Sequence, residues 1–326
     1  MGLKEEIKKY CEDLGLDTIG FIRCRTFDEL RDFYNKRKTS NLENEFEEKD
    51  IEKRINPNIY MEEGKTIISI AFPYLHNTEY INNGFSVYTR GEDYHKVVKS
   101  YLSKICDYIE GLGGKAIGLV DSNTLPERYI AYLAGVGFIG KNNMIITKKY
   151  GSFVFLGEII TDLEINSEDL RTFEDINKFS ECKECTACYK ACPTKAINAS
   201  RKNSNICVSY LTQKKDLEDK HINLLKGKVF GCDICQEVCP YNEDIVFSNI
   251  EQFKPFSFMN ENNTKVLANI NNREFKETFL KTSCGWRGKN VLKRNAIIKL
   301  VKNDVDTVKS LKTDSPYLKD YINRLL

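Results

Sequence analysis

Eight cysteines between residues 182 and 239 are the side chains whose spacing points most directly to chemistry. They are Cys182, Cys185, Cys188, Cys192, Cys207, Cys232, Cys235 and Cys239, and a proline follows at Pro193 and at Pro240. The first run reads C-x2-C-x2-C-x3-C-P, a spacing typical of thiolates that bind [4Fe–4S] clusters. Eight thiolates are the number that two such clusters require. The sequence therefore predicts a protein that transfers electrons one at a time.

The ligands can be divided between two clusters by analogy with two-cluster ferredoxins, in which a run contributes one ligand to the other cluster. One cluster would be bound by Cys182, Cys185, Cys188 and Cys239, and the other by Cys192, Cys207, Cys232 and Cys235. A disulfide framework is disfavoured because the chain is long, opens without a secretory signal and is rich in Lys and Glu. Zinc sites remain the alternative, although they seldom show this spacing.

Asp121 is the side chain outside the cysteines whose position suggests acid–base chemistry. It follows a predicted buried strand over residues 116–120, and ligands of open α/β sheets gather beyond strand ends. An Asp that caps the following turn is an equally open interpretation. Glu127 is the next carboxyl to consider, and we expect it to be solvated or salt-bridged in the first turn of a helix.

A glycine-rich segment follows, with Gly135, Gly137 and Gly140 in the order G-x-G-x-x-G. The dinucleotide fingerprint needs a strand before these glycines and a helix after them, whereas here a helix precedes and strands follow. We therefore expect a tight turn, or backbone that passes close to a flat and bulky group. His95 is expected to be a surface or packing residue, because Val98 stands where the cobalamin-ligating pattern D-x-H-x-x-G has glycine.

The elements that position these residues follow from the apolar pattern. Helices are expected near residues 7–14, 97–109, 126–134, 280–301 and 317–326, and strands at 67–72, 116–120, 144–147 and 153–161. Alternating helices and buried strands predict an α/β domain over residues 1–165. A ferredoxin-like two-cluster domain over 166–250 begins with a polar linker, and a small α-helical unit covers 251–326. Cys11 and Cys106 are expected to be small core residues.

Composition restricts the class of protein. The chain has 326 residues, of which 41% are hydrophobic and 29% charged, so a folded protein is expected. No apolar run approaches the roughly 20 residues that span a bilayer. The acidic start differs from a targeting peptide, so we expect a cytoplasmic location without membrane contact.

A basic segment lies near the end of the chain. Residues 278–302 include seven Lys or Arg and no Asp or Glu, with Trp286 among them. A single-sign run beside an aromatic residue suits a phosphate backbone, although such runs are usually solvated helix faces. The expected nucleic-acid contacts are Arg287, Lys289, Lys293 and Arg294.

Several segments together resemble the epoxyqueuosine reductases, iron–sulfur and cobalamin enzymes that complete queuosine in tRNA. They span nearly the whole chain and include RGEDYH at 90–95, VDS at 120–122, AGVGFIGKN at 134–142, LGEI at 156–159, CVSYLT at 207–212 and WRG at 286–288. The chain departs from the family in a reduced helical, HEAT-like C-terminal extension, in a longer linker before Cys182 and in residues 123–125.

The resemblance implies a base-off cobalamin between the α/β and ferredoxin-like domains, with no histidine below the cobalt. The implied cofactor-binding residues are Asp121, Gly135, Gly137, Gly140, Lys141, Ile145, Leu156 and Ser209. The implied proton donor to the epoxide oxygen is Asp121, which would need a pKa raised by burial beside the corrin. Glu127 is the fallback.

The implied substrate is the epoxide of the modified wobble guanine in tRNAs for aspartate, asparagine, histidine and tyrosine, with electrons from a donor such as a ferredoxin or flavodoxin. One alternative is a corrinoid-dependent reductase of a small molecule, similar to a reductive dehalogenase, which would not need the basic segment. The other alternative is a non-enzymatic two-cluster electron carrier, which would not need Asp121 and the glycine-rich segment.

Overall fold

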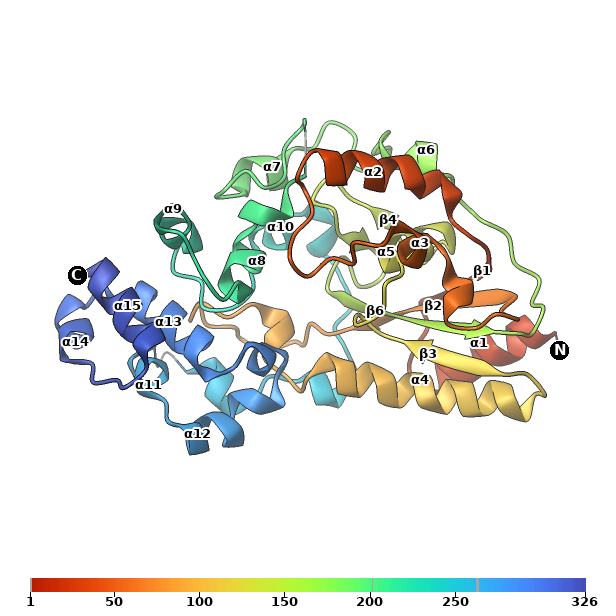
Figure 1. Cartoon of the computed structure of the whole chain (residues 1–326). Coiled ribbons are helices and arrows are strands. Elements are labelled where there is room, and N and C mark those ends of the chain that lie inside the picture. The colour runs from red at the N-terminus through yellow and green to blue at the C-terminus, as the bar shows by residue number, and fades with distance from the viewer. Residues whose placement is uncertain (1, 201, 262–263) are drawn as a thin grey trace.

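The computed structural model of the chain describes residues 2–200, 202–261 and 264–326. An α/β unit lies at one end of the molecule and a helical unit at the other, with the cysteine segment beside both (Figure 1). A four-stranded sheet of order β1-β2-β6-β3 and a two-stranded sheet β4-β5 are present in the described ranges. The strands are β1 Ile19–Arg23, β2 Thr66–Pro73, β3 Ala116–Leu119, β4 Phe138–Ile139, β5 Ile145–Ile146 and β6 Val154–Thr161.

The larger sheet is antiparallel at each of its three strand pairs. β2 is buried along its whole length, and its side chains alternate between two cores. Ile67 and Ala71 face one core, whereas Ile68, Ile70 and Phe72 face the other. A strand that is covered on both faces reads as a continuous apolar run, which explains the pattern over residues 67–72.

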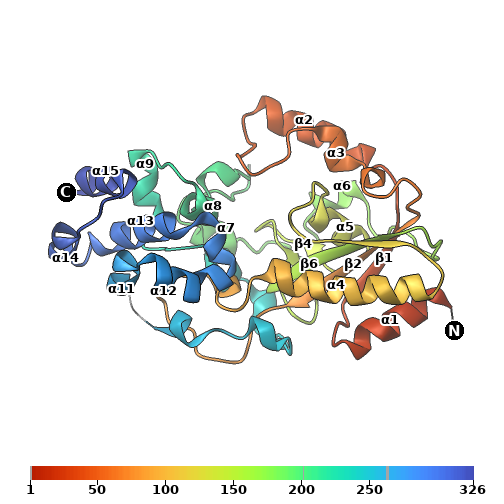
Figure 2. The same ribbon diagram turned by 60° about the horizontal axis from the view of Figure 1, so that its bottom comes forward.

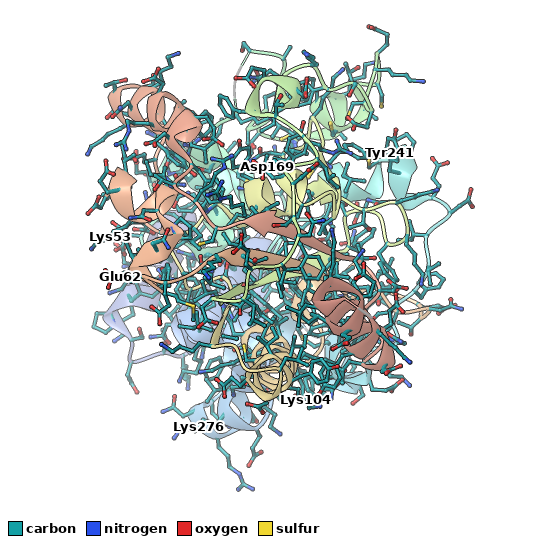
Figure 3. All side chains as sticks on the ribbon, turned by 90° about the vertical axis from the view of Figure 1, so that its right-hand side faces the viewer. Lys53, Glu62, Lys104, Asp169, Tyr241 and Lys276 are labelled. Atoms are coloured by element: carbon teal, nitrogen blue, oxygen red, sulfur yellow. The ribbon has the colours of Figure 1, made fainter. Side chains whose placement is uncertain are left out.

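Helices cover both faces of this sheet (Figures 1 and 2). One face packs on α1 Leu3–Asp13 and α4 Tyr94–Gly111. The other packs on α5 Glu127–Leu133, with α2 Arg31–Thr39 and α3 Ile51–Ile55 beyond it. Figure 3 looks along α4, which carries Lys104, and shows α2 and α3 on the opposite side of the sheet. Cys11 and Cys106 are buried in the core that α1 and α4 form, as predicted.

The remaining α-helices are short and belong to the second half of the chain. They are α6 Phe173–Ile176, α7 Ala187–Ala191, α8 Val208–Gln213, α9 Asp219–Ile222, α10 Ile234–Glu237, α11 Thr264–Asn269, α12 Asn272–Glu277, α13 Lys289–Leu300, α14 Val305–Ser310 and α15 Pro316–Leu325. Short 3₁₀ turns join many of them. Within the described ranges no helix has the length and apolar character needed to cross a membrane.

Three sequence-based expectations differ from the structure. The expected buried strand at 116–120 is β3, an edge strand whose first three residues are partly or fully exposed. The expected helix at 280–301 begins only at Lys289, because Gly288 has a φ of 79° that a helix does not allow. The expected linker at 166–180 packs on the α/β unit, where the Leu170 amide donates to the Leu133 carbonyl at 2.9 Å.

The units of the chain interleave. Residues 80–90 leave the α/β unit and run beside the helical unit, where Asn83 Nδ2 donates to the Met259 carbonyl at 2.7 Å. Phe85 and Phe230 are buried in the same core as the helices α11 and α13. Arg90, which is 3% exposed, donates to the carbonyls of Ile81 and Phe85 at 2.8 and 2.9 Å. The helical core is therefore completed by both preceding parts of the chain.

Arg294 is the largest fully buried side chain and joins α13 to the cysteine segment. Its guanidinium donates to the carbonyls of Lys214 and Lys215 at 2.9 and 2.7 Å, and Nε donates to Asn295 Oδ1 at 2.8 Å. Asn295 is also buried and donates from Nδ2 to the Thr212 carbonyl at 2.7 Å. The expectation that Arg294 contacts nucleic acid is wrong, because these carbonyls use its donors inside the protein.

Replacing Arg294 with Met should destabilise the helical unit by about 3 kcal/mol, because buried carbonyls would lose a charged donor. Lys293→Met is the matched control, since Lys293 is half-exposed and its Nζ lies 3.4 Å from the Ile270 carbonyl. Unfolding of the iron-loaded protein by urea, followed by the fluorescence of Trp286, measures both. Equal midpoints for the two variants would contradict this role of Arg294.

Candidate functional site

The Asp121 loop follows β3 at the edge of the sheet and holds an uncommon backbone conformation. Asp121 has a φ of 46°, in the left-handed region that residues other than glycine seldom adopt. Its amide donates to Glu127 Oε1 at 2.7 Å, and Asn123 Nδ2 donates to the same oxygen at 2.7 Å. Glu127 thus holds the loop from the start of α5. The expectation of a solvated or salt-bridged Glu127 is wrong, because its carboxylate binds this loop.

The Asp121 carboxylate binds two side chains from the first turn of α4. Oδ2 accepts from the Tyr94 hydroxyl at 2.7 Å and lies 2.9 Å from His95 Nε2. The other ring nitrogen of His95 lies 2.7 Å from Asp93 Oδ1. Asp121 therefore does not cap its own turn through its side chain. The expectation that His95 is only a surface or packing residue is also wrong, because it links two carboxylates.

These contacts place a proton on His95. Burial lowers the pKa of His95, but the hydrogen bonds and charges of Asp121 and Asp93 outweigh it and raise that pKa to about 9. Burial raises the pKa of Asp121, yet the hydrogen bonds from His95 and Tyr94 hold it below its usual value. The direction is opposite to the raised pKa that we expected for Asp121. The reason is a cationic partner that the sequence pattern did not reveal.

The Asp121 carboxylate is open on one side. Its side chain is 54% exposed, although Tyr94 and His95 both bind Oδ2. Loss of solvent on the protein side is the largest influence on its pKa. Asp121 is therefore accessible to a ligand that approaches from solvent.

A second carboxyl lies close to Glu127. Glu158, in the middle of β6, is 0% exposed, and apart from Glu127 neither of its oxygens has a hydrogen-bond partner. Burial, followed by the charge of Glu127, raises the pKa of Glu158 well above its usual value. Sequence analysis did not single out Glu158 as a site residue, although an acid inside an otherwise apolar strand is a signal that could have identified it.

All eight cysteines of the two runs carry free thiols and lie near one another. Burial is the largest cause that raises the pKa of Cys188, Cys235 and Cys239. Cys182, Cys185 and Cys239 also raise the pKa of Cys188. Cys235 is influenced by Cys232, Cys207 and Cys192 and also by Cys188, so the thiols do not separate cleanly into two groups. The division of the ligands between two clusters stays a prediction.

The glycine-rich segment joins the α/β unit to the first thiol group. The Lys141 amide lies 3.4 Å from Cys182 Sγ, and its Nζ donates to the carbonyls of Lys183 and Cys185 at 2.5 and 3.2 Å. Asn142 Nδ2 lies 3.4 Å from the Cys235 carbonyl. The ammonium of Lys141 is thus bound within the cysteine segment.

The other expected corrin contacts are packed against the protein itself. A Cβ on Gly137 would lie 2.5 Å from the Ile146 carbonyl, and one on Gly140 would lie 2.6 Å from Ile146 Cδ1. A Cβ on Gly135, which has a φ of 71°, would lie 2.6 Å from Leu170. Gly137 and Gly140 therefore serve the close packing of the β4–β5 hairpin, whereas Gly135 is exposed and turns the chain after α5. Ile145 and Leu156 are also buried, at 3% and 8% exposure, whereas Ser209 is half-buried.

Fewer basic side chains of residues 278–302 are free to bind a ligand than the composition suggested. Arg287 donates from Nε to the Gln213 carbonyl at 2.6 Å and stacks on Trp286, with 4.6 Å between its guanidinium carbon and the ring centroid. Trp286 is 53% exposed and packs edge-on against Phe46. Lys289 and Lys293 are half-exposed.

The chain matches two family models. Residues 181–242 match the 4Fe-4S double cluster binding domain, and residues 54–122 match the family described as "Epoxyqueuosine reductase QueG, DUF1730". An epoxyqueuosine reductase of Lactococcus garvieae is 36% identical over 309 residues, which cover 91% of this chain and 86% of that protein. One from Bacillus subtilis is 36% identical over 91% of this chain and 78% of its own length.

Solved structures are similar over nearly the whole chain. A crystal structure of epoxyqueuosine reductase with an epoxyqueuosine-modified tRNA-Tyr stem loop has a TM-score of 0.89 and 33% identity, and covers 99% of this chain and 89% of that one. A Bacillus subtilis epoxyqueuosine reductase with the catalytic loop of an aspartate swung out of the active site has a TM-score of 0.88 and 32% identity, at the same coverages.

The charge on His95 provides a direct test of the site. We expect its imidazole to titrate near pH 9 in NMR spectra of histidine-labelled protein, because Asp121 and Asp93 stabilise the protonated ring. Asp121→Asn should lower that pKa below about 8, since one of the two anionic partners is removed. His221 is the internal control and should not respond. A His95 pKa near 6.5 in the unsubstituted protein would contradict the ion pair.

Proposed function

This chain belongs to the epoxyqueuosine reductase family of oxidoreductases, and we propose that it reduces epoxyqueuosine to queuosine at the wobble position of tRNA. The reaction removes the epoxide oxygen as water and leaves an alkene, so it consumes two electrons and two protons. The observation that carries the proposal is the pairing, in one chain, of a double-cluster domain that contains all eight cysteines with an accessible Asp121–His95 pair. The thiols serve the electrons and the pair serves the protons.

The double-cluster domain over residues 181–242 supplies the electron path. The proposed ligands of one cluster are Cys182, Cys185, Cys188 and Cys239, and those of the other are Cys192, Cys207, Cys232 and Cys235. Four soft thiolates in each group are the donor set that a [4Fe–4S] cluster requires. Cys185 is the exposed member, which gives an external donor such as a ferredoxin or flavodoxin a route to the first cluster.

A base-off cobalamin is the second proposed cofactor, and it would lie on the open side of the Asp121 carboxylate. The residues proposed to face it are the Asp121 loop, the Lys141 backbone and Ser209, with the buried Ile145 and Leu156 as supporting residues. When bound, cobalamin would supply a low-valent metal centre that passes electrons to the substrate carbon framework. The protein residues hold the substrate in place and keep water out.

The proton path that we propose runs from His95 through Asp121. Near neutral pH the proton of this pair resides on His95, whose pKa is about 9, and Asp121 is ionised. As negative charge develops on the epoxide oxygen, Asp121 Oδ2 would take the proton of His95 Nε2 and pass it to that oxygen. The second proton, which completes water, and the proton that recharges His95 would come from solvent. Tyr94, which donates to Oδ2, keeps the carboxylate in place.

The substrate is proposed to be tRNA of the queuosine group, which reads aspartate, asparagine, histidine and tyrosine codons. A family member has been crystallised with a tRNA-Tyr stem loop that carries epoxyqueuosine. Of the basic residues considered, Arg287, Lys289 and Lys293 remain proposed phosphate contacts, because Arg294 is buried. The exposed ring of Trp286 lies beside Arg287, where a base could stack.

The cluster load tests the electron path. Anaerobically reconstituted protein should hold about eight irons and eight sulfides, and Cys185→Ser should lose the iron of one cluster and retain much of the other. Cys106→Ala is the control, because Cys106 is buried in the apolar core and should not affect iron content. Iron and sulfide analysis with electron paramagnetic resonance measures both. Stoichiometric zinc without iron would refute the proposal.

The acid role of Asp121 is tested by Asp121→Asn, which preserves shape but cannot donate an acidic proton. Conversion of epoxyqueuosine-containing tRNA should fall by about 10²–10⁴, the usual effect of losing a general acid. Clusters and cobalamin should remain bound. Ser122→Ala alters the exposed neighbour in the same loop and should leave the rate unchanged. Nucleoside analysis of the tRNA measures turnover, and near-normal conversion by Asp121→Asn would exclude Asp121 as the acid.

A further inference from the structure

We propose that Glu158 stays protonated inside the sheet and positions the Glu127 carboxylate, which in turn holds the Asp121 loop in its left-handed conformation. Glu158 is a positioning residue in this scheme, and it never contacts the substrate. The inference rests on the proposed function in one respect, namely that the Asp121 loop takes part in catalysis. The contacts that carry it are independent of which reaction the enzyme catalyses.

The first observation is the burial of Glu158. Its side chain is 0% exposed, and apart from Glu127 neither oxygen has a hydrogen-bond partner. An ionised carboxylate in such a place costs several kcal/mol unless it is paired, so the group exists there as the neutral acid. A neutral acid carries one proton to donate. Glu127 is the acceptor to which that proton is directed, since it forms a side-chain hydrogen bond with Glu158 and begins the helix that packs on this face of the sheet.

The second observation is the position of Glu158 in the sheet. In β6 it lies opposite Leu119 of β3 on one side and Ser69 of β2 on the other. β3 ends at Leu119, so the Asp121 loop begins within two residues of this register position. The face of β6 that carries Leu156 and Ile160 packs on α5, whose first residue is Glu127. By strand alternation Glu158 shares that face.

The third observation is the strained backbone of Asp121, which the hydrogen bonds to Glu127 stabilise. Asp121 has a φ of 46°, and this left-handed conformation costs free energy for a residue other than glycine. The Asp121 amide and the Asn123 amide group both donate to Glu127 Oε1 at 2.7 Å. Hydrogen bonds to a charged acceptor are stronger than those to a neutral one, so an ionised Glu127 holds the loop best.

The two carboxyls therefore have separate roles. Like charges this close do not both ionise, and the more buried Glu158 keeps the proton. Burial, with Asp121 acting in the same direction, raises the pKa of Glu127 to about 7. The charged groups around Glu127 are Asp121 in its loop, Glu158 on β6 and Arg128 on α5, with His95 on α4 paired to Asp121. Above about pH 7 Glu127 is ionised and accepts strong hydrogen bonds from the Asp121 loop. Below that pH Glu127 is protonated, so these hydrogen bonds weaken.

Hydrogen exchange of residues 120–125 in the full-length, iron-loaded protein tests the inference without tRNA. After correction for intrinsic exchange, protection of the Asp121 amide should be greater at pH 8 than at pH 6. Glu158→Leu removes the proposed donor, so protection at pH 8 should fall roughly tenfold and the pH at which it is lost should rise. Glu158→Gln supplies a neutral donor of the same shape and should retain the protection of the unsubstituted protein at pH 8.

The Gln variant decides the outcome at pH 8, even if the Leu variant does not fold. Lost protection in Glu158→Gln, with normal protection of β6, would show that an anionic Glu158 is needed and would overturn the proposal. Retained protection in both Glu158 variants would overturn it as well. Ser69→Ala is the control for a polar deletion on the same sheet face and should change nothing. None of these experiments measures turnover. The acid role of Asp121 is tested separately by the Asp121→Asn variant, so the two proposals can fail independently.

Discussion

The backbone pairing of β2 with β6 is the interaction on which the rest of the structure depends. Eight consecutive residues of each strand face one another, from Thr66 opposite Thr161 to Pro73 opposite Val154. β1 and β3 add to the two outer sides of this pair, and the α1–α4 and α5 layers pack on its two faces. The site inherits its geometry from this ladder, because β3 is aligned by β6 and delivers the chain directly to Asp121.

The electrostatics of the site depend on the first turn of α4, which lies beside the Asp121 loop. α4 starts at Tyr94, and its first turn presents Tyr94 and His95 to Asp121. A histidine between two aspartates becomes a cation, and one of those aspartates gains a proton source without being neutral itself. The family resemblance implied an acid that would be raised in pKa by burial. In the structure Asp121 is paired instead with His95, which holds the pKa of Asp121 below its usual value.

Local patterns were enough to predict much of the fold. The continuous apolar runs became β2 and β6, and the apolar stripe at 97–109 became the inner face of α4, since these signals are set by neighbours in the sequence. The cysteine spacing likewise predicted a double-cluster domain. The strand direction was not predictable in this way, and the open α/β argument for Asp121 assumed parallel strands where the sheet is antiparallel. Arg294 was misassigned because its carbonyl acceptors, in residues 212–215, lie some 80 positions away in the chain.

The interleaving of the units has a consequence for synthesis on the ribosome. Asn83 and its partner Met259 are separated by 176 positions, and Lys299 Nζ donates to the Asn83 carbonyl across 216. Residues 80–90 therefore emerge long before their native partners exist, and Phe85 stays without the core that later buries it. A nascent chain must keep this segment from wrong associations until nearly all of its length is made. The molecule matures as one body, in which residues 80–90 and the C-terminal helices complete the same core.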